Sequence, residues 1–490
     1  MKKIFFLTSL LLTGCSMYEA PDVPHMDTPD EFKNQIDADN SQLKNAWWEN
    51  FNDEDLNELV AEALDENYNY QIALNNIDIA VTYVDQNRSA FFPQIDAAAT
   101  YSRNKFVPDE FFGAFPTPGN GSPVTTTSSS PSSGSAASPF LNGGIFDVNL
   151  IALSASYELD VWNQVGNSVK QAQANVIANQ AQADVIKLSL VSAVVNTYFQ
   201  LMALNTNLNN LNQQYVAIDE IKELAHVQYV SGLIDESQVY NAKIQKQNTG
   251  VMIEATEKQK QIMENTLAYL LGEYPEEFDL EPEGSLNQIA FDLLIPEGVP
   301  SQMLTERPDI QSAYYQMLSY GYLEKQALSN FFPSFSLTGG YGYANQDLGS
   351  LISEPSKFWS YGVNVSQFVF DYAVRESEYD RAGEQFESSI LNYQDTVMNA
   401  FTEVNNALVS YQEDNEALHR YLQQSEHYQQ LVSIADAQYQ AGLVNYTTYL
   451  NNELSLLQTQ YNVTNQQLMV AQDVIAVYKS LGLGLEEPYL

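Results

Sequence analysis

Long stretches of the chain carry apolar residues at helical spacing and contain almost no proline or glycine. The two longest run over residues 161–230 and 372–440. At ~1.5 Å per residue, each would form a helix on the order of 100 Å long, more than three times the thickness of a bilayer core. A helix of that length is neither a membrane span nor the core of a globular domain. The pattern therefore predicts coiled-coil-like packing against neighbouring helices.

Each long helix is expected to end in a tight turn that leads into a return helix. The two turns, Tyr-Val-Ser-Gly-Leu-Ile-Asp at 229–235 and Tyr-Gln-Ala-Gly-Leu-Val-Asn at 439–445, have the same design. A glycine stands where a helix ends in a left-handed residue, and an Asp or Asn three positions later suits the next N-cap. These residues are Gly232, Asp235, Gly442 and Asn445. We call the two segments the hairpin tips.

The period changes from helical to alternating after each of two Phe-Phe-Pro sequences, at 91–93 and 331–333. Alternation of apolar and polar side chains predicts strands. Four strands of about ten residues are expected, at about 94–105, 146–159, 334–344 and 359–370. Aromatic side chains on the later two strands are expected to face lipid, as in the aromatic girdles of membrane barrels. They are Tyr341, Tyr343, Trp359 and Tyr361.

The same order and spacing of helical and alternating segments occurs twice, which predicts one internally duplicated body. Leu64 to Pro93 and Leu304 to Pro333 have the same spacing, and so do the segments between each tip glycine and a later Leu-Gly. The expected organisation is a first repeat over 47–280, a linker over 281–300, a second repeat over 301–484 and a tail over 485–490. A Pro/Gly/Ser/Thr-rich run over about 106–144 separates the first two strands and is expected to be a long low-complexity loop.

The N-terminus has the pattern of a bacterial lipoprotein signal. Two lysines precede a short apolar segment, and Leu12-Thr-Gly-Cys15 matches the lipobox. Residues 1–14 would then be removed, and Cys15 would be lipidated (palmitate among its acyl chains) at the start of an extended leader, 15–46. An ordinary signal peptide followed by an unrelated thiol is the alternative. Cys15 is the single cysteine, so no disulfide framework is expected.

Charge and composition exclude some classes of function. The chain has 490 residues and a formal charge of −41, which makes nucleic-acid binding improbable. The acidity suits solubility or salty surroundings, or a water-filled path that favours cations. No nucleophile–base pair, phosphate-binding loop or histidine cluster with ligand spacing is found. We therefore expect no enzyme activity, no catalytic residue, no cofactor and no metal site.

Four strands are too few to close a barrel, since the smallest transmembrane barrels need about eight. An open sheet edge in lipid would leave backbone groups without hydrogen bonds. Either the strands form a soluble sheet, or several chains pool their strands into one barrel.

The chain resembles the TolC-like outer-membrane efflux proteins, specifically the lipoprotein branch that serves resistance-nodulation-division (RND) pumps. The resemblance runs from Trp47 to about residue 484 and rests on several short motifs in the same order. They are the lipobox, the two Phe-Pro sequences, the Gly-Leu tips, Arg307-Pro-Asp-Ile310, Tyr157-Glu-Leu-Asp-Val-Trp162 and Phe368-Val-Phe-Asp371. The resemblance implies a mainly α homotrimer with a small β part. Its twelve strands would form one barrel in the outer membrane of a Gram-negative bacterium, and its helices a second barrel across the periplasm.

The same resemblance assigns roles to the hairpin tips and to the end of the second long helix. A periplasmic adaptor protein would dock at the tips, on Gly232, Leu233, Gly442 and Leu443, although these glycines also simply end helices. Asp436 and Val432 match a gate with acidic rings, although Asp436 also suits an exposed helix position. Relatives often carry arginines around Tyr439, where this chain has Gln438 and Gln440. An Asp–Arg latch is therefore not expected.

Three functions fit these patterns. The first is a passive exit duct for small molecules, working with an adaptor and an inner-membrane RND transporter. The second is the exit duct of a type I protein secretion system, which shares the fold but usually lacks a lipobox. The third is a lipid-anchored periplasmic coiled-coil scaffold, which leaves the alternating strands without a purpose.

Overall fold

The computed structural model describes residues 46–105, 145–278 and 307–483, together with residues 19–23 and positions 29, 280, 286 and 289. The chain divides into two compact units. Of the described residues, the strand unit takes Glu19, 86–105, 145–167 and 325–378, and the helical unit takes the rest, mainly 46–85, 168–278, 307–324 and 379–483. Each sequence repeat contributes to both units. The boundary between the two units therefore cuts across both expected repeats, 47–280 and 301–484.

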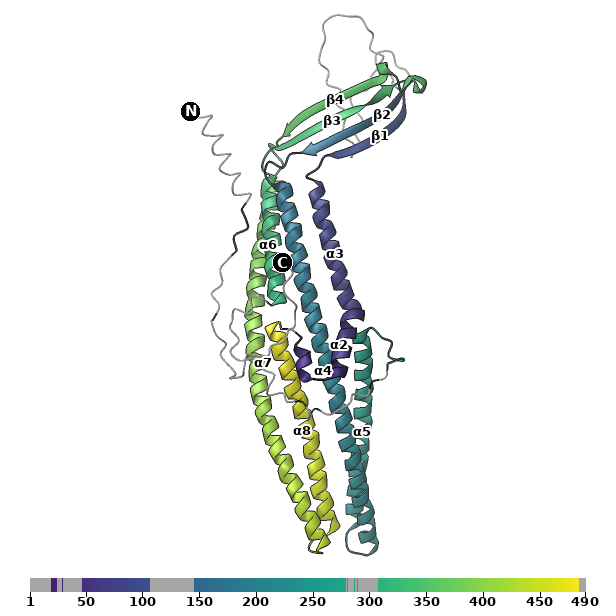
Figure 1. Ribbon diagram of the computed structural model, residues 1–490, viewed down its shortest axis with the longest axis vertical. Helices are drawn as coiled ribbons and strands as arrows, with labels where there is room; N and C mark the ends of the chain where they lie inside the picture. Colours follow the sequence, from purple (N-terminus) through teal and green to yellow (C-terminus); the bar gives the residue numbers. More distant parts are fainter. Residues whose placement is uncertain are drawn as a thin grey trace, which may run out of the picture. The chain divides into compact units, whose positions relative to one another are not determined.

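The strand unit contains one antiparallel sheet of four strands in the order β1-β2-β3-β4 (Figure 1). The strands are β1 (Gln94–Lys105), β2 (Ile145–Glu158), β3 (Ser334–Asn345) and β4 (Lys357–Ser366). The first three lie within one residue of their expected positions. Gly342 brings β3 close to β2, because a Cβ atom there would lie 2.3 Å from the carbonyl oxygen of Ile151. Only glycine allows this approach of the two backbones.

The expected bounds of the fourth strand, 359–370, were wrong at both ends. β4 begins two residues earlier and stops at Ser366, whose partner is Ser334, the first residue of β3. Pro333 precedes β3 and has no N–H to continue the ladder. Beyond Ser366 the side chain of Gln367 donates to the carbonyl oxygen of Phe331 instead, at 3.2 Å. The residues that follow, Phe368, Val369 and Phe370, are consecutive apolar residues, so the apolar run continues beyond the end of the strand.

Paired helices follow the internal repeat closely. Three pairs have equal lengths in the two halves. They are α3 (Tyr68–Ser89) with α6 (Pro308–Ser329), α4 (Gln164–Val230) with α7 (Val374–Gln440), and α5 (Glu236–Leu271) with α8 (Tyr446–Leu481). A shorter helix, α2 (Glu54–Glu66), begins at the N-cap Asp53, whose carboxylate accepts from Leu56 N–H.

The core of the helical unit joins the N-terminal turn at Trp47–Phe51 to α2, α4, α5, α7 and α8. The indole of Trp47 is fully buried and stacks on Tyr478 with ring centroids 5.2 Å apart. The middle of α4 is apolar enough to cross a membrane, but most of that stretch is buried inside the protein. It therefore serves as the core helix of the unit.

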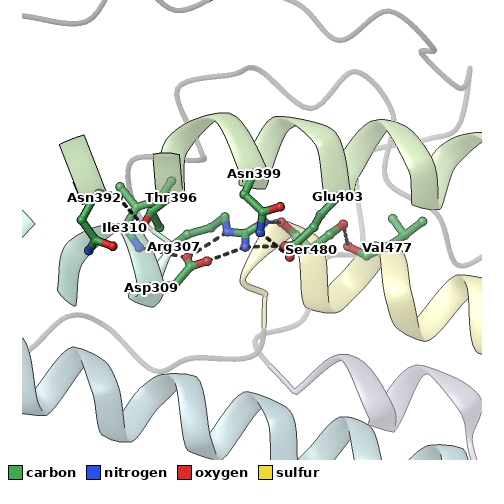
Figure 2. A network of polar contacts seen from close by, with 9 residues as sticks. All are labelled: Arg307, Asp309, Ile310, Asn392, Thr396, Asn399, Glu403, Val477 and Ser480. Carbon is green, nitrogen blue, oxygen red and sulfur yellow. Dashed lines mark hydrogen bonds and ion pairs between the residues drawn. The ribbon is translucent and has the colours of Figure 1, made fainter. Parts of the chain in front are cut away.

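A buried arginine fixes the start of the second repeat (Figure 2). Arg307 is 5% exposed, and its guanidinium bonds both carboxylate oxygens of Asp309, the carboxylate of Glu403 and the carbonyl oxygen of Ser480. These contacts join the N-terminus of α6 to α7 and to the end of α8. Removing one partner of a buried ion pair leaves an uncompensated charge. The network therefore favours the packing of α6, α7 and α8 in which all of the contacts are made.

Candidate functional site

The sheet has two chemically different faces. Residues paired across an antiparallel ladder point to the same side, so the register places the odd-numbered residues of all four strands on one face. That face is mainly aliphatic and aromatic and carries Ile95, Tyr101, Ile151, Leu153, Tyr157, Leu337, Tyr341, Tyr343, Trp359, Tyr361, Val363 and Val365. We call it the apolar face. The other face is mainly small or polar, with Asp96, Thr100, Ser154, Ser156, Ser336, Thr338, Ser360 and Asn364.

The four aromatic residues singled out in the sequence lie together on the apolar face. Trp359 is 68% exposed and Tyr361 82% exposed, and their rings stack 5.8 Å apart. Tyr341 pairs with Trp359 across the ladder and meets Tyr343 edge-on. Clusters of exposed apolar side chains mark surfaces that contact a membrane or another protein. Contact with lipid is the prediction that fits this exposure.

Both outer strands of the sheet have an open edge. β1 pairs only with β2, and β4 only with β3, among the described residues. Because the sheet has an even number of strands and every neighbouring pair is antiparallel, β1 and β4 run in opposite directions. The β4 edge of one copy can therefore pair with the β1 edge of another and keep the antiparallel pattern.

The two hairpin tips have the same backbone structure, as expected from their shared sequence. Gly232 and Gly442 have φ values of 71° and 67°. At each tip the leucine N–H reaches back to a glutamine carbonyl, Leu233 to Gln228 and Leu443 to Gln438. This is the Schellman arrangement, in which such a leucine usually packs on its own helix. Leu233 and Leu443 are nevertheless 75% exposed each, so both are available to a partner.

Asp436 lies on the last turns of α7 and is half-buried. One of its carboxylate oxygens accepts from the side-chain amide of Gln440 at 2.9 Å. Gln440 thus bonds the candidate gate residue within its own helix. Val432, one turn earlier, is also half-buried.

A contact that sequence reasoning missed joins the second hairpin to the first. The hydroxyl of Tyr446, at the start of α8, donates to the carboxylate of Glu220 on α4 at 2.7 Å. This bond raises the pKa of Tyr446 to about 12, so the hydroxyl remains a donor throughout the physiological pH range. Burial, followed by the charge of Glu220, raises the pKa of Glu453 in the same region. No sequence motif pairs residues 226 positions apart.

The two hairpins differ in how their helices are held near the tips. In the first hairpin, Asp219 on α4 pairs with Lys222 on the same helix and with Lys246 on α5, the latter at 2.8 Å. Hydrogen bonds from Lys222 and Lys246 lower the pKa of Asp219. The corresponding residues of the second hairpin, 210 positions later, are Gln429, Val432 and Leu456, which carry no charge.

Some of the expectations from the sequence concern residues that the structure does not describe. Cys15 and the loop over 106–144 lie outside the described residues, so lipidation and the role of the loop stay predictions. Among the residues that the structure describes, no group of three or more His, Cys, Asp or Glu side chains could hold a metal ion.

A sheet with an apolar face and open edges, and long helical hairpins, are features typical of an outer-membrane channel protein. The sequence matches the family described as outer membrane efflux protein over residues 59–273 and 299–483, and the chain belongs to this family. It is thus the outer-membrane exit channel of a tripartite efflux system, resides in the outer membrane of a Gram-negative bacterium, extends into the periplasm and is not an enzyme.

Individual relatives match over almost their whole length. The chain is 27% identical over 504 residues to the cation efflux system protein CusC of Escherichia coli (strain K12), covering 99% of both chains. It is 25% identical over 503 residues to the solvent efflux pump outer membrane protein SrpC of Pseudomonas putida, covering 99% of this chain and 98% of SrpC. The fold is similar to the open state of the Neisseria gonorrhoeae MtrE outer membrane channel, with a TM-score of 0.79 at 23% identity, covering 96% of this chain and 98% of MtrE.

The two faces of the sheet generate a prediction at adjacent positions of β4. Val363 is 69% exposed on the apolar face, and Asn364 lies on the polar face. An arginine facing lipid near the bilayer midplane costs about 2–4 kcal/mol, whereas one facing a water-filled lumen is tolerated. We expect Val363→Arg to reduce strongly the amount of protein assembled in the outer membrane and Asn364→Arg to leave it close to wild type, as measured in fractionated membranes. Equal effects of the two variants would contradict the assignment of the faces.

Proposed function

We propose that three copies of this chain pool their strands into one twelve-stranded barrel in the outer membrane. Their helices would together line a duct through the periplasm. The observation that carries this proposal is the sheet with an exposed apolar face and two open edges. In lipid, an unpaired edge leaves N–H and C=O groups without hydrogen bonds at a cost of several kcal/mol each. Pairing β4 of each copy with β1 of the next removes every edge at once.

Three copies are the smallest number whose pooled strands would enclose a water-filled lumen. Two copies would give eight strands, whose barrel interior is filled by side chains. Twelve strands leave room for a water-filled lumen, and the small and polar residues of the second face are suited to line it. The efflux names of CusC and SrpC support export of small molecules rather than secretion of proteins. The duct would be passive and would receive its cargo from an inner-membrane RND transporter through an adaptor.

The native mass of the detergent-extracted full-length protein tests this proposal. The chain mass is 55.0 kDa before any processing, and we expect a particle of three chains by native mass spectrometry. A particle that is monomeric, or that leaves the membrane without detergent, would mean that the strands do not pool. The lipid-anchored scaffold would then be the better interpretation.

The hairpin tips are the surface that we propose for the adaptor. Both tips belong to the helical unit and lie at the same end of it (Figure 1). Beside them, a groove is lined by apolar residues of α4 and by three carboxylates, those of Asp219, Glu220 and Glu223. A partner suited to this end of the unit would present apolar side chains to Leu233 and Leu443 and cationic side chains to the groove.

Leucine replacements at the tips test the docking surface. Because Leu233 and Leu443 are largely exposed, the double variant Leu233→Ser/Leu443→Ser should fold and reach the membrane with unchanged thermal stability. Loss of two apolar anchors is expected to lower export by about tenfold, as measured by cellular accumulation of a pump substrate. The matched control is Leu348→Ser, at a leucine that is 70% exposed between β3 and β4. Wild-type export in the double variant would remove the docking proposal.

We propose that Asp436 and Val432 line the gate and that the Tyr446–Glu220 bond holds the second hairpin closed. Three symmetry-related copies of Asp436 would repel one another and attract cations. The Asp219 ion pairs, in contrast, hold the two helices of the first hairpin together, which makes the second hairpin the one that moves.

Conductance in planar bilayers tests the gate. Tyr446→Phe removes one hydroxyl and its bond to Glu220, so we expect a severalfold rise in the fraction of time spent open. Asp436→Ala should reduce the preference for cations. Tyr439→Phe is the control, because Tyr439 contacts Tyr446 through its ring. Unchanged currents in the first two variants would contradict the gate assignment.

A further inference from the structure

Two carboxyl groups meet between α7 and α8, away from the hairpin tips. Asp414 lies on α7 and Asp473 on α8, and both belong to the helical unit. Their side chains are close enough to form a hydrogen bond if one of them carries a proton. Neither the proposed duct nor the proposed gate uses this pair.

The hydrogen bonds around Asp414 leave only one way for the buried carboxylate oxygen of Asp473 to gain a partner. The side-chain amide of Gln466, two turns before Asp473 on α8, donates to one carboxylate oxygen of Asp414 at 2.8 Å and to its carbonyl oxygen at 3.0 Å. The Oδ2 atom of Asp473 is buried and has no hydrogen-bond partner among the described residues. Two ionised carboxylates cannot donate to each other, so this buried oxygen gains a partner only when the pair holds a proton.

Nearby cations do not substitute for that proton. Asp473 lines a cavity of about 570 Å³ together with four other charged residues and with uncharged residues of α4 (Val185, Leu188 and Ser189). The charged groups are Arg307 and Asp309 at the start of α6, Glu403 on α7, and Lys479 on α8. Arg307 is already bonded to Asp309 and Glu403. Lys479 is exposed to solvent.

We propose that Asp414 and Asp473 share one proton and form a proton-dependent clamp between α7 and α8. When the proton is bound, a carboxyl–carboxylate hydrogen bond joins the two helices. When it leaves, two negative charges face each other at a partly buried site, and the helices of the second hairpin are pushed apart there.

The direction of the pH effect follows from the titration of Asp473. Burial, and then the hydrogen bond and charge of Asp414, raise the pKa of Asp473 from 3.8 to about 7. A group whose pKa is raised on folding binds its proton more tightly in the folded state than in the unfolded state. Its contribution to stability is therefore lost progressively between pH 3.8 and about pH 7 and is smallest above that range.

Hydrogen exchange on the full-length protein in detergent tests the clamp. We compare peptides covering residues 466–478 at about pH 5.5 and about pH 8, after correction for the intrinsic pH dependence of exchange. The wild type should exchange at least about tenfold faster at the higher pH, which corresponds to a loss of about 1.4 kcal/mol in the free energy of local opening. Asp473→Asn should show the slow rate at both pH values, because its amide donates to Asp414 without a titrating proton.

Matched variants separate the clamp from a general effect of charge. Glu413→Gln removes an exposed carboxylate next to Asp414 and should keep the wild-type pH dependence. If Asp473→Asn fails to fold, Asp414→Asn tests the same point, since its amide can donate to Asp473 while its oxygen still accepts from Gln466. A pH-independent wild type, or an unchanged pH dependence in both Asn variants, overturns the proposal. Faster exchange on adding a chelator at about pH 5.5 would mean that a bound cation joins the carboxylates, which also overturns it.

Discussion

Backbone hydrogen bonding in lipid is the constraint on which this structure depends. The bilayer core offers no water to an unpaired N–H or C=O group, so a sheet that enters it must have no edge. A chain whose described residues form only four strands would satisfy this condition only together with copies of itself. The alternating faces, the even number of strands and the antiparallel order of β1 to β4 are all consistent with that solution. The lipid environment thus requires that the sheet of a single chain be completed by strands of other copies.

The helical unit meets a different requirement. Its helices are far longer than any globular core needs, and the buried residues gather around Trp47, Tyr198 and Tyr478, where α2 and the turn before it pack against four long helices. The Arg307 network adds a polar junction at the start of α6 (Figure 2). Packing is thus concentrated near one region of the long helices. The tips, by contrast, are held by a few specific polar contacts.

Much of the fold could be predicted from the sequence because local signals were strong. Proline and glycine marked the ends of helices, and the two Phe-Phe-Pro sequences marked the change from helix to strand. The end of β4 was predicted too late, because the apolar residues Phe368, Val369 and Phe370 follow Ser366, where β3 has no further residue to pair with β4. The contact between Tyr446 and Glu220, and the pair formed by Asp414 and Asp473, were also missed. Such contacts depend on which helices become neighbours, and a single sequence carries no local sign of that.

The difference between the two hairpins has a consequence for symmetry. A ring built from six identical hairpins would have sixfold symmetry, and each hairpin would have to be equally rigid. Duplication within one chain relaxes this requirement, because the copies can diverge while the backbone design is retained. Asp219 and its two lysines occur in one copy, and uncharged residues stand at the corresponding positions of the other. The proposed trimeric ring of such chains would have only threefold symmetry, with hairpins that carry the Asp219 ion pairs alternating with hairpins that lack them, and this would let an aperture widen while half of its wall stays fixed.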